Sequence, residues 1–234
     1  MGEQNSGFSD DDIADIACLL IPQSESARQE LRKMAAKDDQ RLVGRDDTND
    51  LEIDYALEDD AQNFGLARQD VGQYHLALRL SAKLKNPLRG FTFGRNGKAC
   101  DFHFSDDPFK RLSNVHFRIY FNEHGVLMLE DQSTNGTIVD NTLLKMKAKP
   151  PVETKRTLIS GSKISILMHT GKSDISFLVR IPMRKGRHLI AYEENLAKFL
   201  YEQAMLLPDP NRTIVPGDAG GPVSLIQYRN SNIY

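Results

Sequence analysis

Between residues 74 and 182 the sequence alternates short β-type segments with turn signals, and this alternation constrains the fold more than any other feature. The β-type segments cover residues 74–80, 91–93, 102–104, 115–121, 126–129, 137–139, 157–159, 163–169 and 175–182. Turn-forming residues separate them, among them Asn86-Pro87, Glu123-His124-Gly125 and Asn135-Gly136. Many short strands with frequent turns are typical of an antiparallel β-sandwich. We therefore predict an all-β fold, an antiparallel β-sandwich, for this part of the chain.

A different periodicity follows the last β-type segment. Residues 183–187 form a basic hinge, and residues 188–206 then carry apolar side chains at helical spacing, namely Leu189, Tyr192, Leu196 and Phe199. This spacing predicts a C-terminal amphipathic helix, packed either on the sandwich or on a neighbouring protein. Residues 207–234 contain Pro, Gly and Asn and are predicted to be a linker.

The first 69 residues have the composition of an acidic, largely disordered region. Residues 1–70 contain 18 Asp and Glu against 7 Lys and Arg, a net charge of −11, and few aromatic residues. Such segments bury too little apolar surface to fold alone. We predict disorder over most of this region, with two weak helical stretches at residues 12–20 and 24–36.

The rest of the chain is basic. Because the net charge of the whole chain is −2, residues 71–234 carry +9. A basic domain suits an anionic ligand. Two alternatives remain open at this stage: an acidic solvated tail beside a mildly basic domain, or an acidic tail that neutralises the domain.

Several classes of protein are excluded by what the sequence lacks. No apolar run approaches 18 residues, so no transmembrane helix and no membrane partner are expected. The two cysteines, Cys18 and Cys100, make neither a zinc site nor a disulfide framework. We therefore expect no metal and no cofactor, and a reducing compartment, either cytosolic or nuclear.

Three short polar segments stand at the ends of β-type segments, where loops begin. They are Phe93-Gly94-Arg95, the segment from Arg111 to His116, and the segment from Ser133 to Thr137. An arginine guanidinium offers a rigid fork of donors that matches phosphate. Hydroxyl and amide side chains can donate to a phosphate or hold a peptide backbone. Together the three segments predict a site for a phosphorylated peptide.

Each segment also has an ordinary explanation. Arg95 could form a surface ion pair, and Asn135-Gly136 is a common hairpin turn. A hydrolytic pair of Ser113 and His116 is disfavoured, because both lie on one short segment with no oxyanion hole and no orienting acid in evidence. His116 is better interpreted as a brace beneath the loop.

In order and spacing, these segments resemble the forkhead-associated (FHA) domain, a β-sandwich that binds phosphothreonine. The residues that carry the resemblance are Phe93-Gly94-Arg95-Asn96, Cys100-Asp101, Arg111-Leu112-Ser113-Asn114, His116-Phe117 and Ser133-Thr134-Asn135-Gly136-Thr137. It covers residues 70–182, and it is strongest to the N-terminal FHA domain of fungal checkpoint effector kinases of the DNA-damage response.

The resemblance implies roles for individual residues. Arg95 and Ser113 are expected to grip the phosphate, and Asn114, Thr134 and Asn135 to contact phosphate or ligand backbone. Gly94, His116 and Gly136 are expected to support the site structurally. The family prefers phosphothreonine to phosphoserine because a slot accepts the threonine methyl group.

The resemblance also implies a setting for the chain. We expect a non-catalytic binding module, the regulatory N-terminal part of a nuclear checkpoint serine/threonine kinase, with no direct contact to nucleic acid. The sequence contains no glycine-rich loop followed by a Val-Ala-x-Lys segment, no His-Arg-Asp and no Asp-Phe-Gly. The alternative function is a scaffold that binds partners independently of phosphate.

Two hypotheses concern the ligand. Arg111 lies two residues before Ser113 and is expected to favour an acidic residue at position +3 of the phosphothreonine ligand. Thr48, within the acidic region, could when phosphorylated dock into a second copy and cause self-association.

Overall fold

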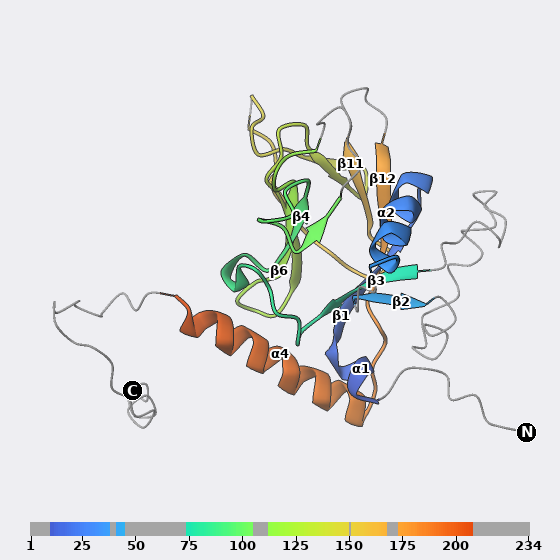
Figure 1. Ribbon diagram of the computed structural model, residues 1–234. Coiled ribbons are helices and arrows are strands. Elements are labelled where there is room, and N and C mark those ends of the chain that lie inside the picture. The colour runs from blue at the N-terminus through green and yellow to red at the C-terminus, as the bar shows by residue number, and fades with distance from the viewer. Residues whose placement is uncertain are drawn as a thin grey trace, which may run out of the picture.

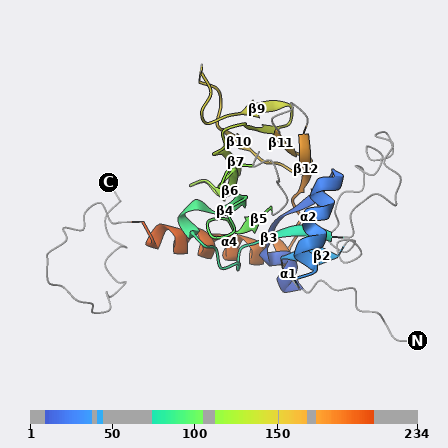
Figure 2. The ribbon, with the colours of Figure 1, turned by 45° about the horizontal axis from the view of Figure 1, so that its top comes forward.

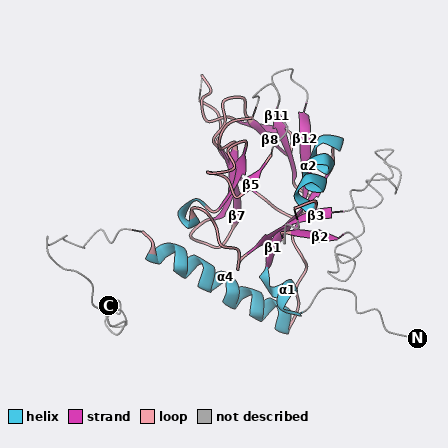
Figure 3. Ribbon diagram, viewed as in Figure 1, coloured by secondary structure: helices cyan, strands magenta, loops and turns pink. Residues whose placement is uncertain are grey.

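The computed structural model describes residues 10–37, 41–44, 74–104, 112–149, 151–167 and 173–207. It contains two β-sheets with a long helix, α4 (Arg187–Met205), at one end (Figure 1). The first sheet has the strand order β2-β3-β1-β12-β11-β8-β9, and the second has the order β10-β7-β6-β4-β5. Figure 3 shows that strands make up most of the body, while helices lie around it.

The strands of the first sheet are β1 (Ile16–Pro22), β2 (Leu42–Gly44), β3 (Tyr74–Arg79), β8 (Thr137–Val139), β9 (Thr142–Leu144), β11 (Lys163–Leu167) and β12 (Ser173–Arg180). Those of the second sheet are β4 (Phe91–Gly94), β5 (Phe102–His103), β6 (Phe117–Phe121), β7 (Leu127–Asp131) and β10 (Lys155–Thr157). The other elements are helices α1 (Asp10–Asp15) and α2 (Glu25–Ala35) and a 3₁₀ turn, η4 (Pro87–Arg89).

The core lies between the two sheets because the strands alternate buried and partly exposed side chains. In β6 the residues Phe117, Ile119 and Phe121 are buried, while the intervening Arg118 and Tyr120 are partly exposed. The Phe93 ring lies 4.5 Å, centroid to centroid, from each of two neighbouring rings, Phe102 and Phe117. Such stacked pairs each add about 0.5–1.5 kcal/mol beyond the burial of apolar area. The predicted all-β sandwich with a C-terminal helix is confirmed.

One strand pair departs from the predicted antiparallel arrangement. Strands β4 and β5 pair in parallel, with Phe93 opposite Phe102. The connection between them contains a compact turn, in which the Cys100 N–H donates to the Asn96 carbonyl over 2.9 Å. The hairpin strand β9 was not predicted, and β10 begins two residues earlier than the predicted segment at residues 157–159.

Part of the N-terminal region belongs to the fold, which corrects the prediction of disorder for that part. Of the helix expected over residues 12–20, residues 12–15 are helical as part of α1, but residues 16–22 form β1 between β3 and β12. The reason is that Ile16, Leu19 and Leu20 are fully buried within the sheet, and burial of a continuous apolar run outweighs local helical preference.

The second predicted helical stretch, residues 24–36, is confirmed as α2. Its N-cap is Ser24, whose Oγ accepts the Ala27 N–H over 3.2 Å. The helix buries Ala27, Leu31 and Met34 and packs against β12 and β3. Residues 1–9, 38–40 and 45–73, with Thr48 among them, lie outside the described residues.

Helix α4 docks on the sandwich at the end where β4 begins and β6 ends. The Phe199 ring stacks on Phe91 at 6.0 Å and meets the edge of Phe121 at 6.0 Å. The Asn195 amide donates to the Ala14 carbonyl over 3.2 Å, which attaches the helix to α1. Figure 2 likewise shows α4 beside the sheets, with α1 near the start of the helix. Of the two expected locations for this helix, the structure has the one on the sandwich.

None of the helices in the described ranges combines the length and the apolar character that crossing a membrane requires.

Candidate functional site

The three polar segments of the sequence meet at the end of the sandwich opposite α4. They follow the end of β4, precede the start of β6 and follow the end of β7. Backbone hydrogen bonds connect the first two, because the Arg95 N–H donates to the Ser113 carbonyl over 3.1 Å. The Thr134 N–H donates to the Ser113 Oγ over 3.1 Å and connects the third segment. The Ser113 hydroxyl therefore already accepts one bond and keeps its own proton to donate to a ligand.

Gly94 allows the first two segments to approach closely. A Cβ atom at this position would lie 2.4 Å from the Asn114 carbonyl oxygen, which no side chain tolerates. The same carbonyl also holds the turn that follows Arg95, because the Asn96 N–H donates to it over 3.1 Å. Glycine is therefore required here for backbone approach, and it sets where Arg95 leaves the strand.

His116 connects the second and third segments from below. Its ring is fully buried, and its Nδ1 accepts the Ser113 backbone N–H over 3.2 Å. The Nε2 therefore carries the proton and donates to the Gly136 carbonyl over 3.2 Å. These two ring contacts are both to backbone groups, and neither is to the Ser113 hydroxyl. This arrangement suits a brace and gives no support to a serine nucleophile.

Asp131 organises the third segment and was missed by the sequence analysis. Its carboxylate is 1% exposed, and its Oδ1 accepts the hydroxyls of Ser133 and Thr137 over 2.7 and 2.8 Å. Its Oδ2 accepts the backbone N–H groups of Ser133 and Met146 over 3.1 and 3.0 Å. An Asp two residues before a Ser is a known turn signal and could have identified it.

Gly136 completes this turn with a backbone conformation that favours glycine. Its φ is +110°, and a Cβ there would lie 2.7 Å from Leu143 Cδ1 and 3.0 Å from the Leu144 carbonyl oxygen. The Gly136 N–H donates to the Ser133 Oγ over 2.7 Å. Strand β9 therefore packs directly against the turn that contains Thr134 and Asn135.

A second buried carboxylate holds the loop that begins at Arg95. Asp101 accepts the Thr92 hydroxyl over 2.6 Å and the Lys85 backbone N–H over 2.8 Å. The Lys85 ammonium in turn donates to the Cys100 carbonyl over 2.6 Å. Burial raises the pKa of the Cys100 thiol, so it stays protonated and donates to the Asn114 carbonyl over 3.0 Å. The loop is thereby fixed at both ends.

Arg95 is charged but has no anionic partner within the described residues. Its Nε is enclosed, with no hydrogen-bond acceptor in that part of the chain. Other arginines of the sandwich are paired: Arg118 with Glu130 at 2.5 Å and Arg79 with Asp12 at 2.7 Å. An enclosed donor without an acceptor is costly, and an arriving phosphate would satisfy it.

Of the other residues predicted to bind the ligand, the structure describes all except Arg111. Ser113 and Asn135 are partly exposed and Asn114 and Thr134 are exposed, so all four side chains can be reached by a ligand. Arg111 lies outside the described residues. The structure therefore brings together Arg95, Ser113 and the third segment.

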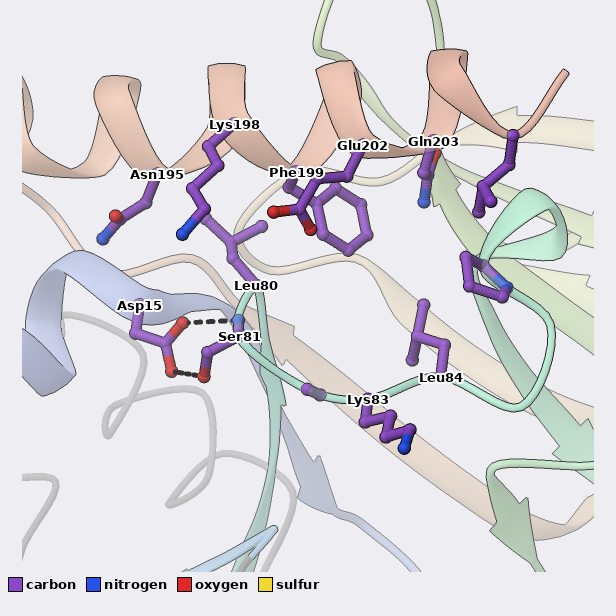
Figure 4. Close-up of a pocket in the computed structure, with 13 residues that line it drawn as sticks. Asp15, Leu80, Ser81, Lys83, Leu84, Asn195, Lys198, Phe199, Glu202 and Gln203 are labelled. Atoms are coloured by element: carbon purple, nitrogen blue, oxygen red, sulfur yellow. Dashed lines mark hydrogen bonds between the residues drawn. The ribbon is translucent and has the colours of Figure 1, made fainter. Parts of the chain in front are cut away.

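A separate cavity of about 500 Å³ lies at the opposite end, between α4 and the segment after β3 (Figure 4). Charges of both signs line it: Asp15, Lys83, Lys198 and Glu202. The Asp15 carboxylate is already used, because it accepts the N–H and the hydroxyl of Ser81, each over 2.7 Å. This cavity offers no concentrated charge for a phosphate. Among the described residues no cluster of side chains could hold a metal ion.

Comparison with known proteins identifies the middle of the chain. Residues 91–166 match the family model described as FHA domain. The chain is 39% identical over 89 residues to serine/threonine-protein kinase RAD53 of Saccharomyces cerevisiae, a match covering 38% of this chain and 10% of that kinase. It is 32% identical over 103 residues to serine/threonine-protein kinase cds1 of Schizosaccharomyces pombe, a match covering 41% of this chain and 20% of that kinase. The chain therefore spans a minor part of either relative.

A solved structure also matches. It is the N-terminal FHA domain of S. cerevisiae Rad53p in complex with a phosphothreonine peptide, 35% identical in sequence. The match covers 40% of this chain and 67% of that one, with a TM-score of 0.32.

Proposed function

Because the chain contains an FHA domain at residues 91–166, we propose that it is a phosphothreonine-dependent protein-binding module and that the three-segment end of the sandwich is its ligand site. The matched family, FHA, is the one that the three polar segments of the sequence resemble. The observation that carries the proposal is Arg95, whose enclosed Nε has no acceptor in the described part of the chain. The Rad53p domain that matches this chain holds a phosphothreonine peptide, which supports the same ligand here.

The binding mechanism follows from the donors at the site. The Arg95 guanidinium and the Ser113 hydroxyl donate to the phosphate, and the Asn114 amide adds a further donor. Thr134 and Asn135 hold the ligand backbone. A phosphothreonine carries about −1.5 to −2 charges at neutral pH, so affinity depends on phosphorylation. This chemistry is binding without catalysis.

Finer features of the partner belong to the same proposal. Arg111 favours an acidic residue at position +3. A separate hypothesis is that phosphorylated Thr48 occupies the site of a second copy, a ligand that would forgo the Arg111 contact because its +3 residue is Leu51. Residues 1–70 carry a net charge of −11 and residues 71–234 a net charge of +9. The acidic region of one copy is therefore attracted to the basic region of another, which supports such an association. Phosphorylation at Thr48 should raise the mass measured by light scattering, and an unchanged mass would remove this hypothesis.

The wider role we propose is regulatory. The two curated relatives are serine/threonine kinases of which the matched segment forms a small part. We propose that this chain is the N-terminal regulatory part of a nuclear checkpoint kinase that acts in DNA-damage signalling, and that it does not contact nucleic acid directly.

A calorimetric titration tests the ligand. A phosphothreonine peptide should bind, its phosphoserine twin should bind more weakly, and its unphosphorylated twin should not bind. Arg95→Ala should weaken binding at least about 100-fold, since charge-assisted hydrogen bonds are lost. Arg32→Ala is the matched control, because Arg32 lies exposed on α2, paired with Glu25 at 3.0 Å. Equal binding of the phosphorylated and unphosphorylated peptides would overturn the proposal.

A phosphate-independent scaffold is the second candidate, and one observation favours it. Helix α4 exposes large apolar side chains: Ile190 is 59%, Tyr201 52% and Met205 62% exposed. These residues lie on the face of the helix turned away from Phe199, which is buried. A partner bound there would be indifferent to the phosphate and to Arg95→Ala.

A further inference from the structure

Three lysines follow strand β9 on an exposed loop: Lys145, Lys147 and Lys149 in residues 145–149, here called the lysine loop. Lys147 and Lys149 are exposed, and Lys145 is partly exposed. The loop lies at the end of the sandwich away from α4 (Figure 1).

Strand register places the start of this loop beside the candidate phosphate site. In the β8–β9 hairpin, Thr137 is paired with Leu144, so the residue after Leu144 lies opposite Gly136. The Leu144 carbonyl oxygen lies 3.0 Å from where a Gly136 Cβ would be, which confirms the close approach. Antiparallel partners are about 5 Å apart. The lysine loop therefore leaves the sheet next to the turn that presents Thr134 and Asn135.

The buried carboxylate of Asp131 fixes both loops together. Its Oδ2 accepts the Ser133 N–H over 3.1 Å and the Met146 N–H over 3.0 Å. The Lys145 N–H donates to the Glu153 carbonyl over 3.1 Å and ties the start of the loop to the return strand. The lysine loop is therefore held in a constant position relative to the turn that carries Asn135.

The acidic side chains nearby already have partners. Glu153 pairs with Arg156 at 3.5 Å, and Glu130 pairs with Lys155 at 3.4 Å and with Arg118. Among the described residues, no carboxylate lies within ion-pair distance of the three lysine ammonium groups. Their positive charge is therefore available to a ligand bound at the neighbouring site.

We propose that the lysine loop is an anionic subsite that binds a second negatively charged side chain, an acidic residue or a second phosphate, of the same phosphothreonine ligand. This proposal rests on the proposed function, since the first phosphate positions the ligand beside the loop. The preferred ligand is then an acidic or multiply phosphorylated segment of a protein. The lysine loop contributes selection among phosphothreonine sites, whereas Arg95 contributes recognition of the phosphate itself.

The test is a scan of peptides against matched charge variants. The peptides carry one phosphothreonine with neutral flanks, then an Asp at each flanking position in turn, then a phosphoserine at the same positions. The loop variant is Lys147→Gln with Lys149→Gln. The control is Lys83→Gln with Lys198→Gln, which removes the same charge from exposed lysines at the α4 end.

Wild type and control should prefer the acidic peptide at one or more flanking positions other than +3, the position assigned to Arg111, by roughly two- to fivefold per charge pair. The second phosphate should give the larger preference, and both preferences should shrink as salt is raised. The loop variant should lose the preferences at those positions, keep any preference at +3, and bind the neutral-flank peptide as wild type does. The Asp and phosphoserine arms distinguish acidic from multiply phosphorylated ligands.

Failure of this inference is distinguishable from failure of the proposed function. If wild type binds the neutral-flank peptide but shows no acidic preference outside position +3, or the loop variant keeps a preference there, the lysine loop proposal is overturned and the proposed function stands. If wild type binds no phosphothreonine peptide, both are overturned. Should a DNA duplex bind wild type but not the loop variant while the peptide scan is flat, the loop serves nucleic acid and the proposal is overturned.

Discussion

The two ends of this sandwich are built from the same strands but held by different chemistry. At the end near α4, aromatic rings do the packing: Phe199 stacks on Phe91, and the charges around the cavity are of both signs. At the opposite end, buried carboxylates hold the loops through hydrogen bonds, and Arg95 has no acceptor for its enclosed Nε within the described ranges. The difference teaches that one end is held mainly by apolar packing, whereas the other is held by hydrogen bonds beside a guanidinium that has no anionic partner among the described residues.

Removing the carboxylate that organises the site should have the largest effect. Asp131→Ala leaves two hydroxyls and two N–H groups without their acceptor, and breaking such a buried network costs about 3–5 kcal/mol. Thermal or urea unfolding measures the loss. Phosphopeptide affinity of the folded fraction should fall as well, and a variant of native stability would contradict the assignment of Asp131 as organiser.

Removing the main aromatic contact of the other end should destabilise without touching the ligand site. Phe199→Ala removes a buried ring stacked on Phe91, at a cost of about 3 kcal/mol. Urea unfolding gives the stability, and titration below the unfolding transition gives the affinity. Unchanged phosphopeptide affinity is expected, and a large loss would show that the two ends are coupled.

Gly136 separates local geometry from global stability. Gly136→Ala introduces a Cβ at a φ of +110° and against Leu143 Cδ1 at 2.7 Å, at a cost of about 1–3 kcal/mol. Because the turn also presents Thr134 and Asn135, affinity should fall by more than stability explains. Urea unfolding and peptide titration of the same sample compare the loss of stability with the loss of affinity. The control is Gly186→Ala, whose added Cβ has no atom within 4 Å.

The smallest effect is expected on the exposed face of α4. Tyr201 is 52% exposed, so Tyr201→Ser should change the free energy of unfolding by less than about 0.5 kcal/mol and leave phosphopeptide affinity unchanged. Binding of cellular partners by a scaffold surface would instead be lost in this variant. A pull-down comparing Tyr201→Ser with Arg95→Ala therefore separates the two candidate functions.

Much of the architecture could be predicted because the strands of the two sheets have clear sequence signals. The alternation in residues 117–121 was sufficient to predict strand β6, and the spacing of apolar residues was sufficient to predict helix α4. Strand β1 could not be identified in this way, because a buried central strand has no alternation and its apolar run also fits a helix. Its pairing with β3 and β12 depends on residues far away in the sequence.

The candidate site was predictable to a different degree. The sequence identifies Gly94 and His116 as supports, and the structure shows a close backbone approach at Gly94 and two backbone contacts from the His116 ring. Asp131 has a local turn signal in Ser133, two residues later, which the sequence analysis did not use, whereas its tertiary contact with Met146 appears in no local pattern. The specific contributions of Arg95, Ser113, Asn114, Thr134 and Asn135 stay predictions, as does that of Arg111.

The most direct test is an NMR titration that follows the side-chain Nε–H of Arg95 together with backbone amides of both ends. A phosphothreonine peptide should shift the Arg95 Nε–H resonance and the amides of residues 94–96, 113–116 and 133–136, and leave those of α4 unmoved. The unphosphorylated peptide should shift none of them. Shifts confined to α4, or equal shifts with both peptides, would contradict the account.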